Sequence, residues 1–139
     1  MCGIAGIFNS TIEDKALYSV GRRMAQQIYH RGPDGNGINI RKRKSGGKVL
    51  LVHTRLSIID LTEAATQPMV FQDKGLSIVF NGEIYNFQEL RLILQSEGYV
   101  FRSRSDTEVI LASYHCWGIK CFDRFIGMWA IAIFDEYKD

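Results

Sequence analysis

Short apolar blocks separated by polar turns predict several strands and three helices in this chain. Nearly continuous apolar runs indicate buried strands, whereas apolar residues spaced three and four apart indicate amphipathic helices. The predicted strands cover residues 3–9, 37–43, 48–53, 76–80 and 127–134, with a short extended stretch at 99–102. The predicted helices cover residues 14–29, 87–97 and 106–117. Strands that come mainly in hairpins, with helices between groups of them, predict an α+β fold or a layered sandwich with helices outside.

Polar residues and glycines mark the ends of the second and third predicted helices. Asn86 with Glu89, and Ser105 with Glu108, have the spacing of capping boxes at helix starts. Gly98 and Gly118 follow the last periodic residues, where glycine commonly ends a helix. The last predicted strand is apolar throughout and needs strand partners or a cover, so we expect the domain to continue beyond residue 139.

The composition of the chain limits the kinds of molecule that we expect it to bind. The 139 residues are 46% apolar and 23% charged, which is typical of one globular domain, and a net charge of +2 is too small to indicate nucleic acid. The basic run 41–44 adjoins a Ser-Gly-Gly turn, so we interpret it as a solvated hairpin end. The three cysteines have neither a disulfide-framework nor a zinc-ligand spacing. With no leader pattern and no apolar stretch near 18 residues, we expect a cytoplasmic protein without a membrane partner.

Cys2 is the first residue that could carry chemistry. Removal of Met1 would give it a free α-amine beside its thiol. The thiol could then attack a carbonyl while the amine accepts and returns the proton, because their reference pKa values of about 8.5 and about 7.7–8.0 lie close together. The alternative is a small buried cysteine that opens an apolar strand, and from this residue alone both interpretations remain open.

A nucleophile of this kind requires an oxyanion hole, and Asn81 with Gly82 is the best candidate. The predicted strand ends at Phe80, and the two residues follow it in a polar turn. A side-chain amide and a neighbouring backbone N–H could point at one oxygen. An ordinary strand-to-helix turn, in which Asn-Gly is common, is the alternative.

Two charged residues complete a candidate site. Arg55 follows an apolar strand, and its guanidinium could hold a carboxylate through two parallel hydrogen bonds; a structural ion pair with Asp60 is the alternative. Asp106 could pair with an ammonium group, although acids are favoured at helix starts in any case. Together these residue types describe attack on the side-chain amide of an amino acid.

At this point the sequence resembles a known family, the class II glutamine amidotransferases, and most of all the N-terminal glutaminase domain of glutamine-dependent asparagine synthetases. The resemblance covers essentially the whole chain. The blocks that carry it are Met1-Cys2-Gly3-Ile4-Ala5-Gly6, His30-Arg31-Gly32-Pro33-Asp34, His53 with Arg55-Leu56-Ser57-Ile58-Ile59-Asp60, Gln67-Pro68-Met69, Asn81-Gly82-Glu83-Ile84-Tyr85-Asn86 and Ser105-Asp106-Thr107-Glu108.

The resemblance implies an N-terminal-nucleophile hydrolase fold, a four-layer αββα sandwich of antiparallel sheets, and hydrolysis of L-glutamine to L-glutamate and ammonia. It implies that Cys2 is the nucleophile, that Asn81 and Gly82 form the oxyanion hole, and that Arg55 holds the substrate carboxylate. The remaining implied glutamine contacts are Ile58 and Ile59 through backbone groups, Asn81, Glu83 and Asp106. Residues that it places at the border of the pocket or in supporting roles are Arg31, Gly32, Pro33, Asp34, His30 and His53.

The implied partners are L-glutamine and a synthetase domain or subunit that receives ammonia; a homodimer of the full-length protein is a further implied assembly. The resemblance implies no cofactor for the glutaminase half, with ATP and Mg needed only by a synthetase domain. Residues 45–47 share only their opening letters with that domain's nucleotide loop, so we do not interpret them as an ATP site. A catalytically silent or regulatory module that retains the fold is the alternative function, and the physiological ammonia acceptor stays open.

Overall fold

The computed structural model describes residues 2–56 and 62–138. Ile58 and Ile59, two of the predicted glutamine contacts, lie outside the described residues. The strands are β1 (Gly3–Ser10), β2 (Gly35–Lys42), β3 (Lys48–Arg55), β4 (Met69–Phe71), β5 (Leu76–Ile84) and β6 (Gly127–Asp135). The α-helices are α1 (Asp14–Gln27), α2 (Phe87–Ser96) and α3 (Asp106–Trp117), and short 3-10 turns connect several elements.

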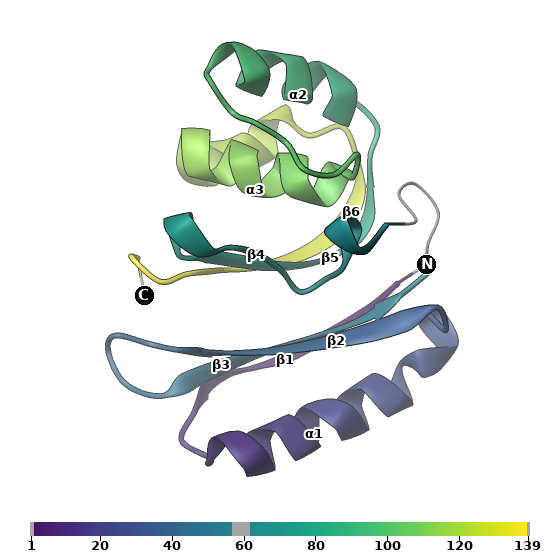
Figure 1. Ribbon diagram of the computed structural model, residues 1–139, viewed down its shortest axis with the longest axis vertical. Helices are drawn as coiled ribbons and strands as arrows, with labels where there is room; N and C mark the ends of the chain where they lie inside the picture. Colours follow the sequence, from purple (N-terminus) through teal and green to yellow (C-terminus); the bar gives the residue numbers. More distant parts are fainter. Residues whose placement is uncertain (1, 57–61, 139) are drawn as a thin grey trace.

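These elements stack in four layers. Three strands form one antiparallel sheet in the order β1-β3-β2, and three form a second in the order β4-β5-β6. Figure 1 shows α1 on the outer face of the first sheet and α2 with α3 on the outer face of the second. This confirms the predicted α+β sandwich of two antiparallel sheets between helical layers.

The alternation of side chains along β3 explains how one strand serves two cores. Leu50 and Val52 point to the outer face, where they pack with Leu17 of α1. Val49 and Leu51 point to the other face, where they pack with Val79 and Phe134 of the second sheet. Because successive residues of a strand face opposite sides, a continuous apolar run is required in a strand that is covered on both faces.

The second helical layer forms the largest core. Ile78, Phe80 and Ile84 of β5 pack against Leu94 of α2 and Ile110 of α3, and all five are almost completely buried. All eight residues from 106 to 113 of α3 are buried, including its acidic first turn. The start of α3 therefore lies inside the protein, against the end of β5.

The predicted helix ends are confirmed in part. The Ser105 hydroxyl accepts a hydrogen bond from the Glu108 N–H at 3.3 Å, as a helix cap does, and Gly118 follows α3 with a φ of 61°. The Asn86 side chain does not cap α2; its Nδ2 donates to the Arg124 carbonyl at 2.9 Å, and its Oδ1 accepts from the Ile126 N–H at 3.0 Å. Asn86 thus fastens the segment before β6 to the end of β5.

The basic hairpin end is less solvated than predicted. Arg41 donates to a carboxylate oxygen of Glu136 at 2.8 Å and to Gln72 Oε1 at 3.2 Å, so it links the first sheet to segments of the second. The guanidinium of Arg43 lies over the ring of Phe8, 4.4 Å from its centroid.

Strand β5 is longer than the sequence predicts. The prediction that it ends at Phe80 is wrong, because β6 pairs with it as far as the Ile84–Gly127 pair. Asn81, Gly82 and Glu83 therefore belong to a strand and not to a turn. Pairing with a long apolar neighbour has overridden the local turn preference of Asn-Gly.

Candidate functional site

Three strand ends meet at one end of the sandwich. The N-terminal end of β1 lies beside the C-terminal end of β3, because Gly3 pairs with Thr54. The C-terminal end of β5 points to the same end of the molecule, next to the start of α3 (Figure 1). Ile4 of β1 packs against the buried cluster between the sheets that contains Val79 of β5. Cys2 and Asn81 lie two residues further along the same strand faces, towards this end. The fold thus gathers Cys2, Arg55, Asn81–Ile84 and Asp106.

Contacts from two segments hold Cys2 in place. The Leu56 N–H donates to the Cys2 sulfur at 3.3 Å, and the thiol lies 3.6 Å from the Leu56 carbonyl oxygen. The Arg31 Nε donates to the Cys2 carbonyl at 3.0 Å. The thiol is half-buried and not in a disulfide, so it is positioned and still reachable.

The loop of residues 30–34 is fastened to the end of β3. The Asp34 N–H donates to the Arg55 carbonyl at 2.9 Å, and Pro33 forms a bridge to the same residue. A Cβ on Gly32 would lie 2.4 Å from the Thr54 carbonyl oxygen, so only glycine allows this approach. The loop therefore lies at the same end of the sandwich as Cys2 and Arg55.

Arg55 lies at the last position of β3. Its Nη2 donates to the Thr62 carbonyl at 3.1 Å, and its Nη1 is 3.5 Å from the Thr66 hydroxyl. These contacts orient the guanidinium at the site end of the sandwich. Asp60, its alternative ion-pair partner in the sequence, lies outside the described residues.

Asn81 and Gly82 occupy the part of β5 nearest the site. The Asn81 Oδ1 is buried and has no hydrogen-bond partner in the part of the chain that the structure describes. Gly82 is exposed, with a φ of 153°, and a Cβ there would lie 2.2 Å from the Met128 carbonyl oxygen of β6. Glycine is therefore required for β5 and β6 to stay paired at this point.

Asp106 brings a buried carboxyl group to the end of β5. Its Oδ2 accepts a hydrogen bond from the Ile84 N–H at 3.2 Å, and the residue is 4% exposed. Burial raises the pKa of Asp106, backbone N–H groups oppose this effect, and the nearby Glu83 carboxylate raises the pKa further. A cation bound beside Asp106 and Glu83 would offset both the cost of burial and the repulsion between the two carboxylates.

His53 is buried between the sheets, behind this end of the sandwich. Neither ring nitrogen has a hydrogen-bond partner at normal geometry among residues 2–56 and 62–138. Burial lowers the pKa of His53 to about 4; the Phe80 backbone opposes the shift and the Arg55 charge adds to it. The imidazole is therefore neutral near pH 7, whereas His30 is exposed. The supporting role of both histidines stays a prediction.

The buried imidazole predicts a measurable acid sensitivity of the fold. The folded-state pKa of about 4 lies below the ordinary value of 6.5, so the unfolded chain takes up the proton first as the pH falls. Stability that is complete above pH 6.5 is lost towards pH 4, and a shift of this size corresponds to about 3 kcal/mol in the free energy of unfolding. Urea denaturation of the wild type and of His53→Leu across this pH range measures the difference. Parallel pH curves for the two proteins would refute the assignment.

Cys116 and Cys121 lie away from the strand ends where Cys2 is held. Cys121 is buried, and burial raises its pKa to about 11, which keeps the thiol protonated. Cys116 is half-buried on α3. Within the described residues, no group of three His, Cys, Asp or Glu side chains is placed to hold a metal ion. No helix in the described part of the chain has both the length and the apolar character to cross a membrane.

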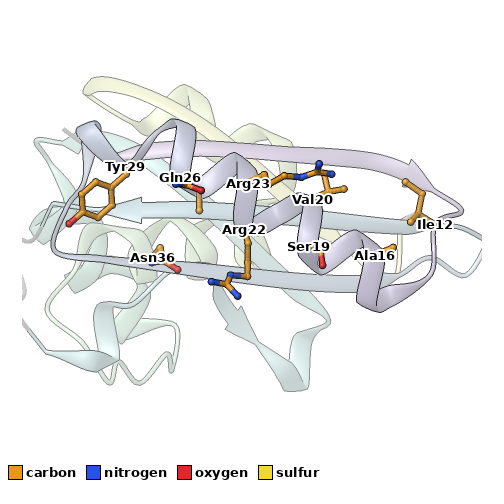
Figure 2. A pocket seen from close by; sticks show the side chains of 10 residues that line it. Ile12, Ala16, Ser19, Val20, Arg22, Arg23, Gln26, Tyr29 and Asn36 are labelled. Carbon is orange, nitrogen blue, oxygen red and sulfur yellow. The ribbon is translucent and has the colours of Figure 1, made fainter.

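A separate open groove of about 1200 Å³ runs along α1. Figure 2 shows Ser19, Arg23, Tyr29 and Asn36 among its lining side chains. The described residues that line it include no cysteine, histidine or carboxylate, and none of the candidate site residues.

Comparison with known proteins identifies the family. A family model described as a glutamine amidotransferase domain matches residues 1–139. The chain belongs to the glutamine amidotransferase domain family. Among its relatives, asparagine synthetase (glutamine-hydrolyzing) 1 of Bacillus subtilis strain 168 is 39% identical over 98% of this chain and 21% of the relative. Asparagine synthetase B (glutamine-hydrolyzing) of Escherichia coli strain K12 is 38% identical over all of this chain and 24% of the relative.

A solved structure supports the fold of this amidotransferase domain. The glutamine phosphoribosylpyrophosphate amidotransferase of B. subtilis, complexed with ADP and GMP, superposes with a TM-score of 0.73 at 24% identity, covering 96% of this chain and 35% of that one. These findings confirm the predicted family and fold. The chain spans only about a fifth to a quarter of the two synthetases.

Two residues that contact the candidate site were assigned no role from the sequence. Leu56 contacts the Cys2 sulfur through its backbone. Gln67 bonds both to the Phe80 N–H and to Thr107, which lie beside Asn81 and Asp106. Gln67 belongs to a recognised motif, but its partners are 13 and 40 residues away, so no local signal indicates them.

Proposed function

We propose that this domain hydrolyses the side-chain amide of L-glutamine to L-glutamate and ammonia, with Cys2 as the nucleophile after removal of Met1. The observation that carries the proposal is the convergence of a held thiol, Arg55, Asn81-Gly82 and Asp106 at one end of the sandwich. The charges suit a zwitterionic amino acid. Arg55 would bind the α-carboxylate through a bidentate pair, and Asp106 with Glu83 would bind the α-ammonium group.

The reaction then has two halves, with the α-amine of Cys2 as the base. This amine takes the proton of the thiol, and the sulfur attacks the side-chain carbonyl carbon. The oxyanion accepts hydrogen bonds from the Asn81 side-chain amide and the Gly82 N–H. When the C–N bond breaks, the amine returns the proton to the leaving nitrogen, and ammonia departs from a thioester.

Water completes the cycle. It attacks the thioester carbon while the Cys2 amine takes one of its protons, and the same two donors stabilise the second oxyanion. When the C–S bond breaks, the sulfur regains a proton and glutamate leaves. The proposal uses only groups of this chain and water, and it assigns neither ATP nor Mg²⁺ to this domain.

The names of the relatives indicate where the ammonia would go. Both relatives are named as glutamine-hydrolyzing asparagine synthetases, and each is several times longer than this chain. We infer that the released ammonia passes to a synthetase domain or subunit. The test is glutamate release by the Met1-free protein with L-glutamine as substrate and L-asparagine as control. A folded, Met1-free protein that releases no glutamate would favour the silent module.

Replacing Arg55 with alanine is expected to weaken glutamine recognition more than chemistry. Loss of a charged hydrogen-bond pair raises the KM for glutamine by about 10- to 100-fold, with a smaller change in kcat. Arg55→Lys keeps the charge without the planar fork and should recover only part of the loss. Steady-state kinetics measure both constants, with the urea midpoint as a check of folding because Arg55 also bonds to Thr62. An unchanged KM in Arg55→Ala would remove Arg55 from the site.

A further inference from the structure

Along one edge of β5, the neighbouring strand β4 ends before β5 reaches the candidate site. The short strand β4 pairs with β5 only from Leu76 to Ile78. In an antiparallel strand, alternate residues direct their backbone N–H groups to the same edge. The Tyr85 N–H donates to the Ile126 carbonyl on the β6 side, so the odd-numbered residues of β5 direct their N–H groups to β6. The N–H groups of Phe80, Gly82 and Ile84 therefore point to the opposite edge, beyond the end of β4.

Side chains replace the missing strand at two of these three positions. The Gln67 Oε1 accepts from the Phe80 N–H at 2.6 Å, and the Asp106 Oδ2 accepts from the Ile84 N–H at 3.2 Å. Among the described residues, no side chain or loop accepts a hydrogen bond from Gly82, which lies between them and is exposed. Of these three N–H groups, that of Gly82 is therefore the one available to a ligand. It is also the N–H that the proposed mechanism directs at the oxyanion.

The same glutamine also reaches the start of α3. Its Nε2 donates to the Thr107 hydroxyl at 3.1 Å, and Thr107 directly follows Asp106. Phe80 can only donate through its backbone N–H, so the amide orientation of Gln67 is fixed. Gln67, Phe80 and Thr107 are each less than 7% exposed, so water cannot easily replace these hydrogen bonds.

The backbone of Gln67 is held from the opposite sheet. A Cβ on Gly37 of β2 would lie 2.0 Å from the Gln67 carbonyl oxygen, so the two backbones are in close contact. The side chain thus extends from a fixed point to two elements of the site. One element carries the oxyanion donors, and the other carries the acid that would bind the ammonium group.

We propose that Gln67 is a positioning residue, whose side-chain amide sets the placement of Asn81-Gly82 relative to Asp106. This inference rests on the proposed glutaminase function. A substrate bound at its ammonium end must present its amide carbon to the thiol and its oxygen to the donors, and small displacements of such groups slow the chemistry strongly.

The test compares two variants near this amide with one at the far end of β1. Gln67→Met keeps the approximate size and removes both hydrogen bonds. Thr107→Val removes only the link to α3. Ser10→Ala is the matched control, because it deletes a buried hydroxyl that accepts from the Ile12 N–H at 3.2 Å. For each protein, kcat and KM for glutamine hydrolysis and the urea midpoint are measured.

We expect Gln67→Met to lower kcat by about tenfold or more and to raise KM, because β5 and α3 both lose their hydrogen bond to residue 67. Thr107→Val should raise KM with kcat nearly unchanged, because the Phe80 bond remains. Ser10→Ala should lower the urea midpoint and leave both constants unchanged. If Gln67→Met fails to fold, the split between KM and kcat in Thr107→Val decides the proposal.

The outcomes separate the two proposals. A wild-type protein that does not hydrolyse glutamine overturns the proposed function, and the role of Gln67 with it. An active wild type with kcat and KM unchanged in Gln67→Met or in Thr107→Val overturns only the role of Gln67. Equal kinetic effects in Ser10→Ala and Gln67→Met would assign the effect to general stability and would also overturn it.

Discussion

Replacing Cys2 with alanine is expected to abolish glutamine hydrolysis while glutamine still binds. The substitution removes the attacking sulfur, and loss of a catalytic nucleophile lowers kcat by about 10⁴-fold or more. Arg55, Glu83 and Asp106 stay in place, so the affinity for glutamine should change little. Glutamate release measures the first effect, and isothermal titration with glutamine measures the second.

Cys116→Ala is the matched control for the loss of Cys2. It removes a half-buried thiol on α3 that takes no part in the proposed mechanism. This variant should keep the activity of the wild type. A Cys2→Ala protein with more than about a tenth of wild-type kcat would contradict the assignment of the nucleophile.

Asn81→Ala is expected to produce the next largest effect, a fall in kcat of about 10²- to 10³-fold with KM nearly unchanged. This is the usual cost of losing one oxyanion donor, about 3 kcal/mol of transition-state stabilisation. The Asn81 Oδ1 has no hydrogen-bond partner in the described part of the protein, so truncation costs little stability. Single-turnover kinetics separate the chemical step from binding and product release.

The conservative variant Asn81→Asp sharpens the same experiment. It keeps the shape of the side chain but replaces the amide donor with a carboxylate, which would repel the oxyanion, so it should be at least as impaired as Asn81→Ala. Gly82 is less suitable for this test, because any Cβ there would collide with the Met128 carbonyl and separate β5 from β6. An Asn81→Asp enzyme with wild-type kcat would exclude Asn81 from the oxyanion hole.

Local sequence patterns predicted several elements because those elements depend on near neighbours. Helix α3 has the predicted bounds, with Ser105 as its cap and Gly118 after its end. Helix α1 ends at Gln27, two residues earlier than predicted, and a 3-10 turn follows at Tyr29–Arg31. The order of the four layers came from the family resemblance, since residue periodicity indicates strands and helices but does not define which sheets stack.

The errors arise where distant partners decide the local structure. The extension of β5 through Asn81 and Gly82 depends on pairing with β6, almost 50 residues away, which no short-range pattern contains. The strand β4 has three residues, too few to show a period. Asn86 matches a capping box, yet its side chain bonds to residues 124 and 126 instead.

For the candidate site, too, local sequence indicated the residue types but not the contacts between distant segments. The residue types for a glutamine site could be named from the sequence, with the family resemblance giving each a role. The contacts that hold them could not, because Leu56 with Cys2 and Asp106 with Ile84 join segments that are 54 and 22 residues apart. Burial explains why His53 is neutral near pH 7, and burial is a property of the folded sandwich alone.

The most direct test of the central claim is the intact mass of the protein after incubation with a glutamine-analogue electrophile that traps N-terminal nucleophiles. We expect a chain without Met1 that carries a single adduct, which peptide mapping places on Cys2, and protection from labelling by excess L-glutamine. A folded chain without Met1 that stays unmodified, or an adduct confined to Cys116 or Cys121, would contradict it.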